Sequence, residues 1–553
     1  MRIRRPFIAA CLGAALLLVH FPGPAWSDAL PASPAAARIE ALVEQGAPAL
    51  PASTAVEASL KRFYEARQFE PAWGDETRTA ALASVLAGAA EHGLDLAFPK
   101  AGLPVGGEPA ARDVALTRLA LRYAAALARG RVDLTQLEAD WAIAAPSVDL
   151  AGGLSTALTK DLAAWYEGLA PHHAAYRHLV AALARYRALA AGGGWAPVPR
   201  GDPLKLGLVA ERVRVLRRRL EAEGDLAPPP APPEPAPVAT AVDAAQAPIQ
   251  RVAIVAGDAP RPDGAAAGGD DPDTVYDEAV EAAVRRFQRR YGIAVDGAVG
   301  PRTLVAMNVP ARARVEQIAL NLERWRALPR EFGDSYMRVN VPAETLDVIA
   351  QGVPVLSMKV VVGDPDHPTP VVRTAIAAVT LNPTWRIPSS IVTKEILPKS
   401  KRDRTYLLKN EIVFAQGQGW QQLPGPKNPL GQIKFETPNK FDVYLHDTPS
   451  RLAFDRFFRA QSHGCVRLEH AAELAGFVLR DLGWNDLQIA QAAGTGETRR
   501  IDLKHRWRVY LLYATSFVDE DGTVEFRDDL YGRDARLRDA LAAGQTVQRQ
   551  AGL

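Results

Sequence analysis

The spacing between apolar residues changes once along this chain, and that change limits the possible folds more than any other feature. Between Val56 and Arg200, Ala, Leu and Arg recur at intervals of three and four residues, which predicts amphipathic helices. From Tyr336 onward the interval is two, in Val- and Ile-rich runs bounded by Gly, Pro and Asn, which predicts strands. We therefore expect a multidomain α+β protein, with a helical N-terminal scaffold followed by a β-rich part.

Two segments interrupt this plan. Residues 227–272 are rich in Pro, Ala and Gly, a composition typical of linkers, and they separate two helical runs that we expect to form one small module. Residues 389–411 look helical and basic, and we expect them to interrupt the strands. Strands are then expected to resume near Asp442–Leu445, and a hairpin to turn at Asp519–Gly522.

The N-terminus has the three-part order of a secretory signal peptide. Arginines in residues 1–5 precede an apolar run at 7–19, and Ala25-Trp26-Ser27 predicts cleavage after Ser27. The run of roughly 13 apolar residues is shorter than the ~20 that span a bilayer. We therefore expect export to the periplasm, with an uncleaved inner-membrane anchor as the alternative. The apolar run continues past Cys11, which argues against a lipoprotein cleavage site.

Removal of the signal peptide would leave Cys465 as the chain's single cysteine, because the other one is Cys11. Oxidising compartments normally pair cysteines, and an unpaired thiol there is exposed to oxidation. A lone cysteine can serve as a small buried hydrophobe. The surrounding sequence S-H-G-C-V-R, residues 462–467, instead favours a reactive group.

The neighbours of Cys465 are those that a nucleophilic thiol needs. A free thiol is mostly protonated at neutral pH, so a histidine must accept its proton. His463, two residues earlier, would share a face with Cys465 on an extended backbone, and His446 ends a strand-like run that could lie alongside. Gly464 would let backbone amides approach a substrate carbonyl and form an oxyanion hole. Arg467 is a fork-shaped donor suited to a carboxylate.

These residues also have structural interpretations. His463 could serve only in packing and Arg467 only in a salt bridge. Asp447 follows His446 in a predicted strand, so its side chain should point away, and an N-cap or turn role is favoured. The Cys, His and Asp side chains together could bind zinc, although the H-x-C spacing is unusual for a structural site. The formal net charge of +2 gives no indication of nucleic-acid binding.

Longer strings around these residues resemble a known family. S-H-G-C-V-R and Y-L-H-D-T-P, with N-P-T-W-R-I-P-S-S-I at 382–391 and N-P-L-G-Q-I-K-F-E-T-P-N at 428–439, are similar to the L,D-transpeptidase catalytic domain of the YkuD type. The second helical run of the module resembles a peptidoglycan-binding module through Phe287, Gln288, Gly292, Asp296, Gly297, Gly300 and Thr303. An ordinary three-helix packing domain is the alternative there. Large Gram-negative members of the transpeptidase family carry both parts.

The resemblance implies a role for each matching residue. It implies that Cys465 is the nucleophile and His446 the general base. It further implies that the oxyanion hole and pocket are completed and supported by Ser462, His463, Gly464 and Arg467. Candidate substrate-binding residues are Tyr444, Trp385 and Arg386. The resemblance also implies that residues 389–432 form a helical lid over the groove. The basic run of this lid, which either meets acidic stem peptides or faces solvent, consists of Lys399, Lys401, Arg402 and Arg404.

The implied reaction is acyl transfer in peptidoglycan. Attack after the third residue of a donor stem would release the terminal D-alanine and leave a thioester, which an amine of an acceptor stem would convert to a 3→3 cross-link. The resemblance implies no metal or other cofactor. The implied partners are donor and acceptor stem peptides, carbapenem β-lactams as covalent inhibitors, and other wall-synthesis proteins. A same-fold hydrolase acting on wall peptides or a wall-anchored lipoprotein, and a non-catalytic wall-binding protein, are the competing interpretations.

The resemblance covers roughly residues 56–535 and completes the expected domain order. The order is a signal peptide (1–27), a helical scaffold (28–204), the peptidoglycan-binding-like module (205–310), a connecting helix (311–335), the catalytic domain (336–495), and a C-terminal hairpin and tail (496–553).

Overall fold

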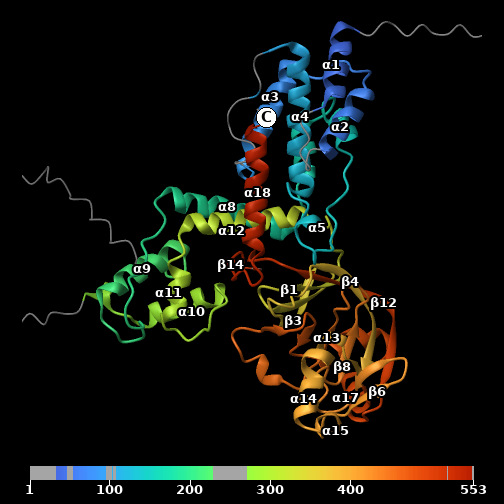
Figure 1. Ribbon diagram of the computed structural model, residues 1–553. Helices are drawn as coiled ribbons and strands as arrows, with labels where there is room; N and C mark the ends of the chain where they lie inside the picture. The colour runs from blue at the N-terminus through green and yellow to red at the C-terminus, as the bar shows by residue number, and fades with distance from the viewer. Residues whose placement is uncertain are drawn as a thin grey trace, which may run out of the picture.

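The computed structural model describes residues 33–46, 54–94, 103, 107–227, 271–519 and 521–550, with side chains as far as 544. The predicted signal peptide with Cys11 and residues 228–270 of the predicted linker lie outside these ranges. None of the helices within them combines the length and the apolar character that a membrane crossing requires. Helices dominate the first 330 residues and strands dominate the rest, as the two apolar periodicities predict (Figure 1).

A group of N-terminal helices stands upright at one end of the molecule and shares one core (Figure 1). Its longest helix is α4 (Pro109–Arg129), which begins with proline in its first turn and ends at Gly130, whose φ of 83° is in the left-handed region. The carboxylate of Asp113, on α4, accepts hydrogen bonds from the backbone of Ala72 and Trp73 and from the Tyr64 hydroxyl. The other helices of this group are α1 (Pro34–Gln45), α2 (Thr54–Glu65), α3 (Glu76–Ala87), α6 (Leu150–Ala157) and α7 (Leu162–Leu169), whereas the short helix α5 (Leu134–Leu137) packs into the core of the β-rich domain.

Two packed helices, α8 (Ala174–Ala191) and α12 (Ala311–Arg326), cross beneath this group and join the core of the β-rich domain. The small module projects to one side and consists of α9 (Glu211–Glu223), α10 (Glu278–Arg290) and α11 (Pro301–Met307) (Figure 1). The Gln288 side chain ties its motif together, because its amide bonds the Asp296 carboxylate and the backbone of Gly297. These motif residues therefore shape the module's own turn.

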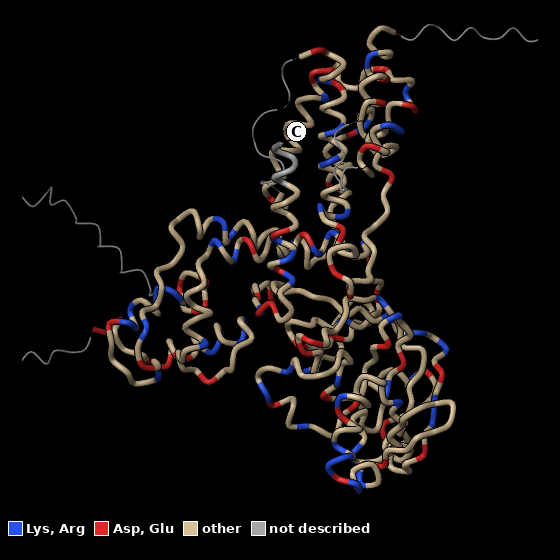
Figure 2. Tube along the Cα trace, viewed as in Figure 1, with Lys and Arg blue, Asp and Glu red and all other residues tan. Residues whose placement is uncertain are grey.

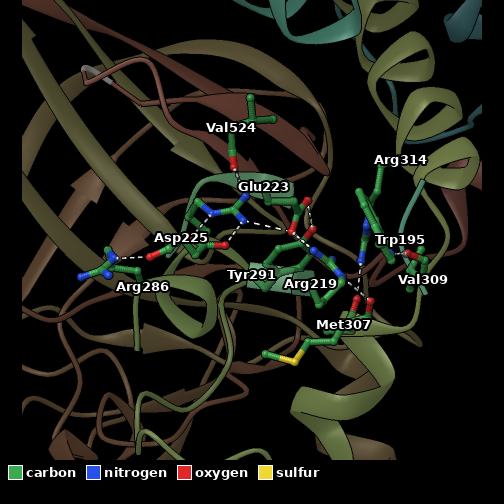
Figure 3. A network of polar contacts seen from close by, with 12 residues as sticks. Trp195, Arg219, Glu223, Asp225, Arg286, Tyr291, Met307, Val309, Arg314 and Val524 are labelled. Carbon is green, nitrogen blue, oxygen red and sulfur yellow. Dashed lines mark hydrogen bonds and ion pairs between the residues drawn. The ribbon is translucent and has the colours of Figure 1, made fainter. Parts of the chain in front are cut away.

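A buried carboxylate fixes the module to the rest of the protein (Figure 3). Glu223, at the end of α9, accepts hydrogen bonds from the hydroxyls of Tyr186 on α8 and Tyr291 after α10, both at 2.7 Å. It also pairs with Arg219 at 2.8 Å and with Arg290 at 3.1 Å. Burial raises the pKa of Glu223, but the two arginines outweigh burial and lower that pKa to about 2.

The same arginines reach other parts of the chain. Arg290 pairs with Asp225 and donates to the Val524 carbonyl (3.0 Å) in the C-terminal hairpin, while Arg219 donates to the Met307 carbonyl (2.8 Å) at the end of α11 (Figure 3). The network thus joins all three helices of the module to α8 and to the C-terminal part.

The β-rich domain is built on one nine-stranded sheet in the order β10-β3-β11-β9-β8-β4-β12-β1-β2, and an additional pairing of β2 with β3 closes it. Helices α16 (Ala471–Leu479) and α17 (Asp486–Gly494) pack against it. The strands are β1 (Tyr336–Asn340), β2 (Thr345–Ala350), β3 (Val353–Gly363), β4 (Val372–Leu381), β8 (Ile433–Glu436), β9 (Leu445–His446), β10 (Ala460–Ser462), β11 (Val466–Leu468) and β12 (Arg499–Leu512). Strand β12 lies inside this sheet, so the sheet extends past residue 495, where the predicted domain ends.

The predicted helical lid is only partly helical. It contains α13 (Ser389–Ile391), a π-helical turn (Val392–Ile396), α14 (Leu397–Arg402) and α15 (Tyr406–Lys409). It also contains β6 (Ile412–Ala415) and β7 (Gly419–Gln422), which form a three-stranded sheet with β5 (Trp385–Arg386), a strand just before the predicted bounds. The lid, with β5 included, has a small core of its own. Lys and Arg gather on α14 and the turn after it, at the far end of the domain (Figure 2).

The strands of the main sheet resume at Ile433, earlier than the predicted Asp442–Leu445. Strand β8 has four residues and β9 two, too short for alternation to stand out from the turn residues around them. The predicted C-terminal hairpin is present as β13 (Ser516–Val518) and β14 (Val524–Phe526). Helix α18 (Arg533–Gln550) then returns along the N-terminal helices, where Arg536 pairs with Glu138 (Figure 1).

Candidate active site

Three neighbouring strands present a polar face at the middle of the sheet. His446 on β9 is paired in register with Arg467 on β11 and with Lys434 on β8. Residues paired in this way lie on the same face of a sheet, so the three side chains form a row across it. The alternate residues, Leu445 and Phe435, are buried in the core. Short polar–apolar alternations in I-K-F-E, Y-L-H and V-R-L therefore separate the site from the core.

A tight turn before β11 positions Cys465. The buried Ser462 hydroxyl donates to the Cys465 carbonyl (2.6 Å) and accepts the Gly464 N–H (3.1 Å). Gly464 has a φ of 102°, which a residue with a side chain rarely adopts, and its carbonyl accepts the Thr369 hydroxyl (2.8 Å). The register then places Cys465 opposite Tyr444 and diagonal to His446.

This turn contradicts the prediction for His463. The bend at Gly464 interrupts the extended backbone on which positions 463 and 465 would share a face. His463 is exposed, and its Nε2 lies 3.2 Å from the carboxylate of Glu395 in the lid. Its ring is tilted by 43° against that of His367, with centroids 4.6 Å apart. His463 therefore links the turn to the lid, and His446 is the histidine on the face that holds Cys465.

The Tyr444 hydroxyl connects the thiol to the lid. It lies next to both the Cys465 side chain and the side chain of Trp385 on β5, within reach of a hydrogen bond to each. Its ring lies edge-on to that of His446, with centroids 5.7 Å apart. Arg386, the third candidate substrate-binding residue, lies close enough to Lys434 for its charge to lower the pKa of that lysine. All three predicted substrate-binding residues thus lie around the thiol and the row.

His446 is a neutral base with a defined tautomer. Its ring is 4% exposed, and Nδ1 lies 2.5 Å from the backbone carbonyl of Asp447. A carbonyl can only accept, so Nδ1 carries the hydrogen and Nε2 keeps its lone pair. Burial, the positive charge of Arg467 and that of Lys434 lower the pKa of His446 to about 3. The imidazole is therefore uncharged at neutral pH.

The thiol is also uncharged in this state. Burial raises the pKa of Cys465 above its ordinary value, although hydrogen bonds from Tyr444 and the charges of Lys434 and Arg467 oppose that effect. Cys465 and His446 are therefore not a preformed thiolate–imidazolium pair. The arrangement suits proton transfer from Sγ to a neutral imidazole during attack on a bound carbonyl.

We expect alkylation of Cys465 by iodoacetamide to accelerate with pH and to show no plateau below pH 9, the ordinary pKa. Only the thiolate reacts, and no imidazolium is present to stabilise it. Alkylation rates measured by mass spectrometry over roughly pH 6–10 would check this, with Cys465→Ala as the blank. A rate that levels off near neutrality would show that an ion pair exists before substrate binds.

Comparison with known proteins agrees with this geometry. Residues 334–501 match the family model described as "L,D-transpeptidase catalytic domain". The β-rich domain is an L,D-transpeptidase catalytic domain of the YkuD type. Residues 58–183 match a "Scaffold domain", and residues 265–307 match a "Putative peptidoglycan binding domain". The predicted combination of a helical N-terminal region, a small module and a YkuD-type domain is confirmed.

One curated relative is a protein of Haemophilus influenzae named "Putative L,D-transpeptidase". It is 29% identical over 241 residues, which is 40% of this chain and 49% of the relative, so the match spans about half of that protein's length. Among solved structures, an L,D-transpeptidase from Xylanimonas cellulosilytica is 16% identical with a TM-score of 0.20, over 57% of this chain and 99% of that one. The catalytic domain of the E. faecium enzyme is 12% identical with a TM-score of 0.19, over 33% and 99%.

The structure decides between the side-chain roles left open for Asp447 and Arg467. The Asp447 carboxylate is not an N-cap, and it stabilises the turn before β8, because it accepts the backbone N–H of Gln432 (2.8 Å) in that turn and pairs with Arg451. The backbone carbonyl of Asp447 orients His446 instead. The position of this carbonyl does not depend on the face of the strand to which the Asp447 side chain points. Arg467 forms no salt bridge with any carboxylate among the described residues, so the structural interpretation fails and its guanidinium stays available beside the thiol.

The zinc interpretation finds no matching arrangement in the described ranges, where no three His, Cys, Asp or Glu side chains are grouped to hold a metal ion. The structure also adds Lys434, which sequence reasoning missed. The available signal was its place in Q-I-K-F-E, where a strand would put Lys434 and Glu436 on one face and Ile433 and Phe435 on the other. The strand itself was not predicted there.

Proposed function

We propose that this protein is a peptidoglycan L,D-transpeptidase that forms 3→3 cross-links through a thioester on Cys465. The observation that carries this proposal is the row of Arg467, His446 and Lys434 beside a thiol held by Tyr444, on the polar face of an L,D-transpeptidase domain. The match of residues 265–307 to a peptidoglycan-binding family supports the same substrate.

In the first half-reaction, Sγ of Cys465 attacks the carbonyl of the L,D bond that follows the third residue of the donor stem. The thiol proton passes to Nε2 of His446, and the carbonyl oxygen becomes an oxyanion. Because Gly464 donates its N–H to Ser462, the Cys465 N–H, which binds no described residue, is the donor left for the oxyanion. The C–N bond then breaks, the leaving amine takes the proton from His446, and D-alanine departs.

In the second half-reaction, the side-chain amine of an acceptor stem attacks the thioester. His446 removes the amine proton and returns a proton to Sγ as the C–S bond breaks, which regenerates the thiol. A base whose pKa is about 3 gives up a proton readily once it is charged, which favours protonation of both leaving groups. We further propose, from residues 1–27, that the reaction takes place in the periplasm after export.

Incubation with a labelled disaccharide-tetrapeptide, followed by mass spectrometry, tests the proposed reaction directly. Cross-linked dimers with release of D-alanine are the expected products. Tripeptides without dimers would show the hydrolase of the same fold, and unchanged substrate would show a binding protein.

We expect a carbapenem to add covalently to the protein at one site, Cys465. Its strained lactam carbonyl would occupy the position of the donor carbonyl, and the E. faecium relative has been solved "acylated by ertapenem". Intact-mass spectrometry should show one adduct on the protein and none after iodoacetamide treatment. His446→Ala should slow the reaction more than His463→Ala, because His463 contacts the lid. An adduct on Cys465→Ala would contradict the assignment of this thiol.

A further inference from the structure

The proposed reaction, on which this inference rests, has a leaving group with a charge of its own. The departing residue carries a free carboxylate two bonds from its leaving nitrogen. His446 must protonate that nitrogen, so the carboxylate lies only two bonds beyond an atom that is hydrogen-bonded to the imidazole. A group of the protein beside His446 therefore determines whether a free carboxylate or an uncharged group is favoured at this position.

Lys434 occupies that place. It is paired with His446 across β8 and β9, and neighbouring strands are about 4.8 Å apart. Its Nζ lies 4.1 Å from the centroid of the Tyr444 ring, whose hydroxyl lies next to the Cys465 side chain. The ammonium is thus held against the same aromatic ring that contacts the nucleophile.

This ammonium is half-buried and has no anionic partner among the described residues. The nearest candidate on its own strand, Glu436, is already engaged by the Thr380 hydroxyl (2.8 Å) and the Arg500 guanidinium (3.0 Å). Burial lowers the pKa of Lys434, as expected for a cation without a close counter-charge. An unpaired, partly desolvated cation costs free energy unless a ligand supplies the anion.

The order of the strands shows which of the two cations in the row, Lys434 or Arg467, lies on the side of the leaving residue. Cys465 and Arg467 belong to the β11 side of His446, whereas Lys434 lies on the opposite side, on β8. During acyl transfer the carbonyl carbon stays on Sγ and the amine departs past His446. The remainder of the leaving residue therefore extends toward β8 and away from Arg467.

We infer that Lys434 binds the free carboxylate of the leaving residue and so restricts the donor to stems whose scissile bond is the last one. In a stem with one more residue, the carboxylate lies about 3.5 Å farther along the chain, out of reach of this contact. Lys434 is thus a specificity-determining residue for a carboxy-terminal leaving group.

The test compares the tetrapeptide donor with the same peptide ending in a carboxamide. Release of the terminal residue would be measured for the wild type, Lys434→Gln, Lys434→Arg and Lys504→Gln, an exposed lysine on β12 that serves as the matched control. The wild type should favour the acid by on the order of 10- to 100-fold, the range for a hydrogen bond between charged groups. Lys434→Gln should bring the acid-to-amide ratio close to one, Lys434→Arg should retain most of it, and Lys504→Gln should match the wild type.

A binding measurement separates this inference from the proposed function. In the Cys465→Ala background, calorimetry should show tighter binding of the acid than of the amide, and Lys434→Gln should remove the difference. Equal binding of both peptides, or a Lys434→Gln variant that slows both substrates equally, would overturn the role of Lys434 even if cross-links form. If no peptide is turned over, the proposed function fails while calorimetry still decides the role of Lys434. If Lys434→Gln does not fold, the wild-type and Lys434→Arg ratios decide it.

Discussion

Replacing Cys465 with alanine is expected to abolish cross-linking and adduct formation while leaving the fold intact. The substitution removes one sulfur atom from a partly exposed side chain, so little packing is lost. The hydrogen bonds that shape the turn come from Ser462 and Thr369 and end on backbone atoms, so they remain. Removing a nucleophile of this kind typically lowers kcat by about 10⁴-fold or more. Turnover of the labelled tetrapeptide and a thermal melt would be measured together.

His446→Ala should be nearly as damaging, and the double variant should be little worse than either single one. Residues that act as a unit in catalysis have effects that do not add. His463→Ala is the matched control, since that histidine lies two residues before the nucleophile in sequence but contacts Glu395. Turnover within about tenfold of the wild type in either Cys465→Ala or His446→Ala would be inconsistent with cysteine acyl transfer, because general base catalysis alone contributes about 10²–10⁴-fold.

The central pair of the site could be predicted because its signals are local. S-H-G-C-V-R places Gly464 beside a lone thiol, and Y-L-H ends a run that alternates like a strand. The structure then pairs β9 with β11, as expected for a strand alongside the cysteine. The role of His463 could not be predicted, because it depends on the conformation of one glycine. Residues i and i+2 share a face only on an extended backbone, and the φ of 102° at Gly464 is not an extended conformation.

The pairing of Lys434 with His446 lay beyond sequence reasoning for a different reason. It depends on the register between β8 and β9, which the turn between those strands sets and which no pattern within β8 records. The sheet in the lid escaped prediction likewise, because β5 and β6 are distant in sequence and meet only through β7. Long-range pairing is therefore what separates the predicted site from the observed one.

The buried charges of the helical module also could not be predicted from the local sequence. In the sequence V-R-V-L-R-R-R-L-E-A-E, Arg219 and Glu223 look like an ordinary exposed pair spaced by four residues. In the structure both side chains are fully buried, because α8, α10 and the C-terminal hairpin close over them (Figure 3). A pair on a solvated helix is worth a few tenths of a kcal/mol, whereas a buried network with one member removed is strongly destabilised.

Glu223→Ala is therefore expected to destabilise the protein by about 3–5 kcal/mol, because it leaves Arg219 and Arg290 buried without their shared carboxylate. For a domain of this size, each kcal/mol lowers Tm by roughly 2–4 °C, so a fall of about 10 °C is expected. Glu211→Ala removes an exposed carboxylate that pairs with Arg214 on the same helix, and it should change stability by less than about 0.5 kcal/mol. Equal Tm values for the two variants would contradict a stabilising role for the network.

The effect of acid gives this prediction a second, independent measure. Because the pKa of Glu223 is lowered from its ordinary 4.5 to about 2 in the folded protein, its contribution is fully present above pH 4.5 and is lost as the pH falls toward 2. At 1.36 kcal/mol per pKa unit, that contribution is about 3 kcal/mol, in agreement with the lower end of the range expected for the substitution. The stability difference between wild type and Glu223→Ala should therefore be constant near neutrality and should shrink between pH 4.5 and 2. A difference that is the same at both ends of that window would show that the alanine acts by leaving a cavity, and that the charge of Glu223 contributes little to holding the module in place.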